Sequence, residues 1–213
     1  MSIVPLDQAR LEAALDELAA RDAELAAALA RLGYPAPRVR EPGFATLLRV
    51  IAAQQLSTAT AAALLRKLEA ALEGQITAER FLALDDAALR ATGFSARKVE
   101  YGRGLARAVV SGELPVERLH LLEDEEVIER LTALKGFGRW SAEIYLLFAL
   151  GRVDSFPADD LALQIGLMRL KRLEARPTPK ALRTLVEPWR PFRGAAAVFL
   201  WHYYGAATLD EKR

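Results

Sequence analysis

Apolar residues recur at helical spacing along almost the whole chain, and this periodicity limits the possible folds more than any other feature. Leucines near the N-terminus follow one another at steps of three, four or seven, which is typical of one face of an α-helix. Later segments repeat the spacing, whereas no run alternates apolar and polar residues as a half-buried strand does. The sequence therefore predicts an all-α fold.

Capping residues divide this pattern into elements. The leucines between Leu11 and Leu32 predict one long amphipathic helix, interrupted at Asp22 and closed by Gly33. Ser57 and Ser95 are predicted to begin later helices, because a serine side chain accepts hydrogen bonds from the amides of a first turn. Together with these, helices are expected near 44–55, 58–72, 84–92, 96–109, 123–134, 139–150, 159–172, 179–187 and 193–206.

The composition excludes several classes of protein. The chain has 213 residues, 52% hydrophobic and 27% charged, which suits one large domain or two small soluble ones. No stretch of 18 apolar residues lacks a charge, so neither a membrane span nor a membrane partner is expected. The absence of cysteine excludes disulfides, thiolate metal sites and cysteine nucleophiles, and two histidines are too few for a histidine-rich metal centre. The N-terminus lacks a signal-peptide pattern, which predicts a cytoplasmic or nucleoid location.

Two glycines separated by one residue stand between two predicted helices, within Leu134–Ala142. Glycine at 136 and at 138 permits a backbone with positive φ that brings amides close to a ligand. The helix that opens at Arg139 offers its first amides to an anion, and a DNA phosphate is the natural candidate. This pattern is typical of a helix-hairpin-helix. The alternative is a plain turn between two helices.

A pair of carboxylates follows a proline at the start of the helix expected at 159–172. We expect Asp159 to cap this helix and Asp160 to face a cleft. The alternative is that the pair serves only as a helix cap, as acidic residues at helix starts commonly do. Asp160 follows Gly138 by 22 residues, a gap that one helix and a loop fill.

Residues 40–205 resemble the helix-hairpin-helix DNA glycosylase superfamily, and more narrowly DNA-3-methyladenine glycosylase II of the AlkA type. The resemblance implies two helical subdomains with the active-site cleft between them. One spans 43–151 and contains the hairpin at about 123–150, and the other combines 1–42 with 152–213. We expect a compact version without the β-rich N-terminal domain of longer members. The motifs that carry the resemblance are, in order, Ile51–Ser57, Gly93–Lys98, Leu134–Ala142, Phe156–Asp160, and Trp189–Arg193 with Trp201.

The resemblance implies roles for particular residues. Asp160 is the expected catalytic carboxylate, and Trp140 and Trp201 are the expected walls of the base pocket. For each tryptophan the alternative is a core position, since both lie on helical stripes with other apolar residues. Tyr145, His202 and Tyr203 are further candidates to line or support the pocket.

The resemblance also implies a DNA interface. It comprises Gly136, Gly138 and Arg139 in the hairpin, and the segment Gln54–Leu56. Gln55 corresponds to the position whose side chain enters the gap left by a flipped base. AlkA-type proteins have an apolar residue there, so Gln55 and Leu56 are both candidates. The alternative is that Gln54 and Gln55 cap or bridge helix ends.

The expected partner is double-stranded DNA that contains damaged bases, bound by a monomer. No cofactor is required, and the resemblance implies a structural Na⁺ or K⁺ held by the carbonyls of Thr132, Leu134 and Phe137. With 29 Lys and Arg against 28 Asp and Glu, the formal net charge is +1, so DNA would meet a local basic surface.

The predicted function is monofunctional excision of alkylated purines, such as 3-methyladenine and 7-methylguanine. Relatives that also nick the strand place a lysine where this chain has Trp140, which argues against Schiff-base chemistry. Two alternatives stay open. One is a DNA-binding module without catalysis, and the other is a bifunctional glycosylase for oxidised bases.

Overall fold

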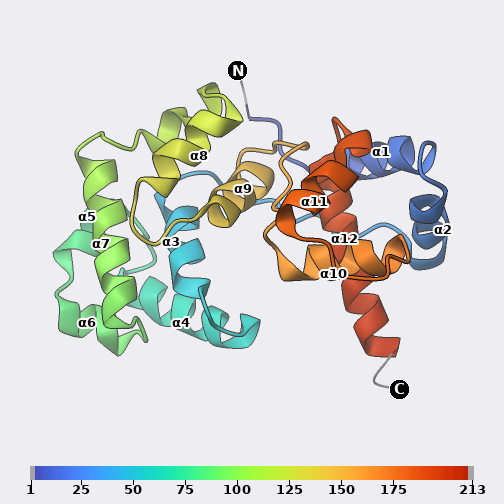
Figure 1. Cartoon of the computed structure of the whole chain (residues 1–213). Helices are drawn as coiled ribbons and strands as arrows, with labels where there is room; N and C mark the ends of the chain where they lie inside the picture. Colours follow the sequence, from blue (N-terminus) through green and yellow to red (C-terminus); the bar gives the residue numbers. More distant parts are fainter. Residues whose placement is uncertain (1–2, 211–213) are drawn as a thin grey trace. The chain divides into compact units, whose positions relative to one another are not determined.

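The computed structural model describes residues 3–210, and within this range every regular element is a helix (Figure 1). The prediction of an all-α fold is confirmed. None of the described helices is both long enough and apolar enough to cross a membrane. The chain divides into two compact units, which are described separately. Residues 40–145 form the first unit, and residues 3–39 with 146–210 form the second.

The first unit is built around α7, which packs against α3, α5 and α6. Gly102 of α7 allows this packing, because a Cβ there would lie 2.6 Å from Cζ of Phe81 in α5. Ser57 and Ser95 cap α4 and α7 as expected, through the amides of Thr60 and Lys98. The helices of this unit are α3 (Phe44–Ala53), α4 (Thr58–Ala71), α5 (Ala78–Ala83), α6 (Asp86–Ala91), α7 (Ala96–Val110), the 3-10 helix η1 (Val116–Leu121), α8 (Asp124–Thr132) and the first part of α9 (Arg139–Phe148).

The second unit is built around the long C-terminal helix α12, which packs against α1, α2 and α10. A continuous apolar core joins these helices. Within the described range, this unit comprises α1 (Gln8–Ala19), α2 (Ala23–Leu32), α10 (Leu161–Leu170), α11 (Pro179–Leu185), the 3-10 helix η2 (Glu187–Trp189), α12 (Arg193–Asp210) and the end of α9.

The prediction of one helix over residues 11–32 is wrong, since the structure has two helices that break at Asp22. Asp22 has extended backbone and caps α2 by accepting the amide of Leu25 at 3.0 Å. Its other carboxylate oxygen accepts Nζ of Lys171 at 2.6 Å and Nε1 of Trp189 at 2.7 Å. These bonds lower the pKa of Asp22 although its burial acts in the opposite direction. Asp22, at the break between α1 and α2, therefore links α2 to the end of α10 and to η2.

Three short elements were not predicted: α5, η1 and η2. Each has six residues or fewer, which is less than two turns of an α-helix. Such a segment shows little of an apolar period, although α6, which also has six residues, falls within the predicted range 84–92.

Candidate active site

Asp160 is fixed by three hydrogen bonds to one of its oxygens. It is the N-cap of α10, and its Oδ1 accepts the amides of Ala162 at 2.9 Å and Leu163 at 3.1 Å. The same oxygen accepts Nε1 of Trp201, on α12, at 3.1 Å. Hydrogen bonds from N–H groups fix the orientation of a carboxylate. The structure thus presents a half-buried, oriented carboxylate at a helix start.

The expected division of labour between the two aspartates is wrong in one respect. Asp160, and not Asp159, caps α10, because the helix begins at Leu161 and places the side chain of Asp160 beside its first amides. Asp159 is exposed, and its Oδ2 pairs with Nη2 of Arg183 on α11 at 3.0 Å. An exposed pair of this kind contributes little to stability. Capping and the candidate catalytic role therefore fall on the same residue.

Trp201 is half-buried and lies beside one aromatic ring and one cation. Its ring centroid lies 5.7 Å from that of Phe148, with an interplanar angle of 37°. The guanidinium carbon of Arg38 lies 5.3 Å from the Trp201 centroid and 6.0 Å from the Phe148 centroid. These separations are in the range of cation–π interactions. The indole thus interacts with a cation through its ring and with Asp160 through its N–H group.

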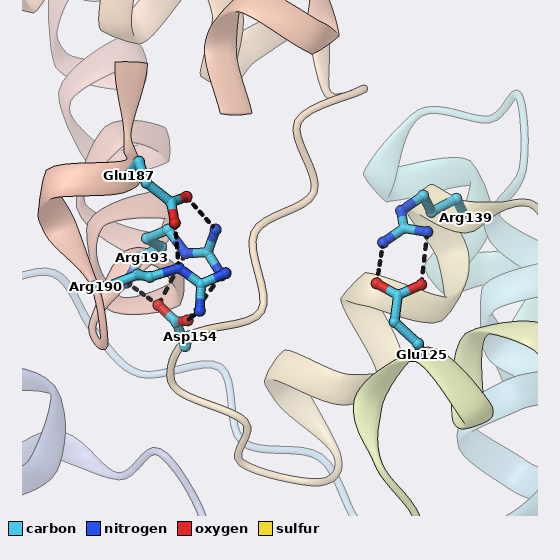
Figure 2. A network of polar contacts seen from close by, with 6 residues as sticks. All are labelled: Glu125, Arg139, Asp154, Glu187, Arg190 and Arg193. Atoms are coloured by element: carbon cyan, nitrogen blue, oxygen red, sulfur yellow. Dashed lines mark hydrogen bonds and ion pairs between the residues drawn. The ribbon is translucent and has the colours of Figure 1, made fainter. Parts of the chain in front are cut away.

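An ion-pair network fixes the start of α12 to the loop that precedes Asp160 (Figure 2). Asp154 accepts Nη2 of Arg193 at 2.7 Å and Nε of Arg193 at 2.9 Å, and it pairs with Arg190 at 3.3 Å. Glu187 bonds the same two arginines, at 2.7 and 3.2 Å. Gly194 permits the close approach, since a Cβ there would lie 2.6 Å from the carbonyl oxygen of Val153. The arginines of the Trp189–Arg193 motif therefore position the helix that carries Trp201.

The hairpin connects α8 to α9 in the first unit, and its two glycines differ. Gly136 has φ of +95°, and a Cβ there would lie 2.5 Å from Cδ2 of Tyr101. Gly138 is outside the positive-φ region, and a Cβ there would meet nothing within 4 Å. The expectation of positive φ at both glycines is thus correct only for Gly136. Gly138 is exposed and precedes α9, where its amide donates to Oγ of Ser141 at 3.1 Å.

Arg139 binds two carboxylates of its own unit, of which Figure 2 shows Glu125. Its Nη1 lies 3.0 Å from Oε2 of Glu125, and its Nε lies 2.9 Å from Oε1 of the buried Glu143. These partners raise the pKa of the guanidinium, the bond to Glu125 having the largest effect. The side chain expected to contact DNA is thus partly exposed and paired with two carboxylates of the protein, and the backbone at the helix start is the part of Arg139 suited to an anion.

Trp140 is the second residue of α9 and is 38% exposed, so it is not a core residue. It belongs to the unit of the hairpin, whereas Trp201 belongs to the unit of Asp160. Tyr145 is buried and its hydroxyl accepts the amide of Gly43 at 2.9 Å, which is a structural role at the start of α3. Burial raises the pKa of Tyr145 to about 12.

The segment Gln54–Leu56 forms the connection between α3 and α4. The side chain of Gln54 donates to the carbonyl of Gly136 at 2.6 Å, which links this connection to the hairpin loop. Gln55 and Leu56 are exposed. Lys98, at the end of the Gly93–Lys98 motif, is half-buried: its Nζ donates to the carbonyl of Ala52 at 2.7 Å, and burial lowers its pKa.

Sequence reasoning missed Arg38 and Phe148, the two neighbours of Trp201. Arg38 lies in a proline-containing segment that has no helical period, and Phe148 is one of several apolar residues in α9. No local pattern identifies either residue, because both contacts join segments that are far apart in the sequence.

The chain matches the model of the family described as HhH-GPD superfamily base excision DNA repair protein over residues 48–191. It is 41% identical over 165 residues to DNA-3-methyladenine glycosylase 1 of Schizosaccharomyces pombe, which covers 76% of this chain and 72% of the relative. It is 31% identical over 193 residues to DNA-3-methyladenine glycosylase 2 of Escherichia coli, which covers 84% of this chain and 65% of the relative.

The fold is also similar to a solved structure of 3-methyladenine DNA glycosylase from Schizosaccharomyces pombe in complex with abasic DNA. The TM-score is 0.81 at 36% identity, and the alignment covers 92% of this chain and 96% of the other. The matched range includes the hairpin, Asp154 and Asp160. The chain therefore belongs to the HhH-GPD superfamily of base excision DNA repair proteins.

Proposed function

We propose that this protein is a monofunctional DNA glycosylase that releases alkylated purines, such as 3-methyladenine and 7-methylguanine, from DNA. The observation that carries the proposal is the carboxylate of Asp160, held by two amides and by the indole of Trp201. The names of the S. pombe and E. coli relatives specify the substrate class.

The proposed chemistry needs a negative charge in a fixed place. Cleavage of an N-glycosidic bond builds positive charge on the deoxyribose, and an ionised carboxylate stabilises that charge and orients the attacking water. A carboxylate whose orientation is already set needs little reorganisation during the reaction. Asp160 meets this requirement, because its three donors come from α10 and α12, two helices packed against each other.

The target base must leave the stacked duplex before it can react. We assign this step to the exposed residues Gln55 and Leu56, which enter the gap, while the hairpin backbone holds a phosphate. Trp201 and Trp140 provide the aromatic faces that recognise a cationic purine. We propose that the protein binds DNA as a monomer, because all these groups come from one chain. We also propose a nucleoid location, where the DNA lies.

One experiment tests the proposal and separates it from its alternatives. The protein is incubated with methylated duplex DNA, released bases are measured, and strand breaks are counted before and after alkali. We expect released methylpurines and breaks only after alkali. Binding without base release would show a module without catalysis. Breaks before alkali, with a complex trapped by borohydride, would show a bifunctional enzyme. Lys98 would then be the first amine to replace, because its pKa is lowered.

The two hairpin glycines provide a matched pair of variants. Replacing Gly138 with valine should weaken binding to damaged and undamaged duplex alike, because the added side chain projects from the exposed helix start without contacting the protein. The free energy of unfolding should change by less than about 1 kcal/mol. Replacing Gly136 with alanine should instead destabilise the protein by about 2 kcal/mol or more, since φ is positive and Tyr101 is in the way. Unchanged DNA affinity in Gly138→Val would remove this helix start from the interface.

We also propose that the hairpin loop holds Na⁺ or K⁺. Carbonyl oxygens are ligands of the right type for such an ion. Thr132 ends α8, where carbonyls lack intrahelical partners, and Leu134 and Phe137 lie in the loop that follows. The carbonyl of Leu134 also accepts the amide of Phe137 at 3.2 Å, which keeps the loop tight. DNA affinity at constant ionic strength should then differ among Na⁺, K⁺ and tetramethylammonium salts. Equal affinity in all three would contradict the proposal.

A further inference from the structure

The connection between α3 and α4 contains a tight turn with an unusual backbone. The amide of Leu56 donates to the carbonyl of Ala53 at 3.2 Å, and the two residues between them are Gln54 and Gln55. Gln54 has φ of −54° and ψ of 131°, and Gln55 has φ of +56°. These values match a type II turn, in which glycine is favoured at the position of Gln55. A side chain in this left-handed conformation persists only where its surroundings hold the turn.

Two side chains hold the turn from neighbouring elements. Nε2 of Gln54 donates to the carbonyl of Gly136 in the hairpin loop at 2.6 Å. Nζ of Lys98 in α7 donates to the carbonyl of Ala52, in the last turn of α3, at 2.7 Å. Both donors are half-buried. The turn is thus anchored immediately before Gln55.

The acceptor of the Gln54 bond is itself closely packed against α7. Gly136 lies so close to Tyr101 of α7 that a Cβ would be 2.5 Å from its ring, and the next residue but two, Arg139, begins α9. Gln55 and Leu56 carry no such anchor and are exposed, Leu56 by 37%. Gln54 therefore connects the residues proposed to enter DNA with the loop proposed to bind its backbone.

We infer that Gln54 is a positioning residue that transmits the placement of the hairpin on a phosphate to the turn, so that Gln55 and Leu56 enter the duplex at a set depth. The inference rests on the proposed function and deepens it. It differs from the expectation that Gln54 contacts DNA, because the amide nitrogen of Gln54 is directed to Gly136. Loss of the bond should affect the opening of a duplex and leave the chemistry at Asp160 intact.

The test compares the same damaged base in duplex and in single-stranded DNA, because a single strand requires no opening. Gln54→Ala should lower the single-turnover excision rate on the duplex about tenfold, which corresponds to about 1.4 kcal/mol. The rate on the single strand and the affinity for undamaged duplex should change less than about twofold. Gln54→Glu has the same shape without the donor and should lower the duplex rate at least as much. Gln75→Ala, which removes an exposed glutamine from another loop of the same unit, is the matched control.

A binding measurement tests the role of Gln54 without requiring base release. The duplex carries an abasic analogue opposite 2-aminopurine, whose fluorescence rises when it is unstacked. Saturating wild-type protein should raise the fluorescence, and saturating Gln54→Ala should raise it clearly less. If the wild type releases no base, the proposed function fails while this measurement still decides the role of Gln54. An equal fluorescence rise, an unchanged duplex rate in Gln54→Glu, or an equal loss on duplex and single strand would overturn the inference.

Discussion

Replacing Asp160 with asparagine should lower the single-turnover rate of base release by at least about 100-fold, while the affinity for damaged duplex persists. The loss corresponds to about 2.7 kcal/mol of transition-state stabilisation. Asparagine keeps an oxygen that can accept the amides of Ala162 and Leu163 and the indole of Trp201, so the helix cap survives. What disappears is the negative charge that opposes the cationic sugar.

Asp159→Asn is the matched control, because the two residues are adjacent and the change in charge is the same. Asp159 is exposed and paired only at the surface with Arg183 among its described contacts, so the rate should stay within about twofold of the wild type. Single-turnover excision and DNA binding are measured for both variants. If excision survives in Asp160→Asn and collapses in Asp159→Asn, the catalytic role belongs to Asp159. Full activity in both variants would contradict the mechanism.

Replacing Trp201 with alanine should lower excision of 7-methylguanine by about 10- to 30-fold, and excision of a neutral base such as hypoxanthine by clearly less. The cationic purine loses the face of the indole, an interaction of roughly 0.5–2 kcal/mol. Both substrates lose the hydrogen bond that orients Asp160. Trp201→Phe keeps an aromatic face without that bond, so it should retain more of the preference for the cationic base. The measurement is the ratio of the single-turnover excision rates on the two substrates, compared between each variant and the wild type.

Trp189→Phe is the control for stability. Trp189 is buried in the same unit, and its indole nitrogen donates to Asp22 at 2.7 Å, so this change also removes an indole hydrogen bond. It should lower the free energy of unfolding by about 1–3 kcal/mol without changing the substrate ratio. If Trp201→Ala lowers the excision rate of both substrates equally and lowers the free energy of unfolding as Trp189→Phe does, Trp201 is a core residue and does not recognise the base.

Much of the helical framework could be predicted because its signals are local. Ser57 and Ser95 cap the helices that follow them through amides only three residues away, and apolar periodicity identified the helices of ordinary length. Asp160 was assigned through the family resemblance, whose ordered motifs include Phe156–Asp160, because the local pattern of a proline and a helix start also fits a plain cap. Local signals gave the wrong result where the same residue type fits two structural roles. Asp22 was seen as an interruption and is a cap, and Asp160 caps the helix that Asp159 was expected to cap.

The sequence by itself determined the all-α class, most helix starts, the family and the identity of the candidate carboxylate, since each depends on neighbours within a few residues or on an ordered set of motifs. Only the tertiary structure decided what surrounds these residues. The bond from Trp201 to Asp160 spans 41 residues, and the bond from Gln54 to Gly136 spans 82. The structure likewise pairs Arg139 with Glu125 at the surface of its unit. Such contacts depend on how separate helices pack, and side-chain spacing along one helix carries no information about that packing.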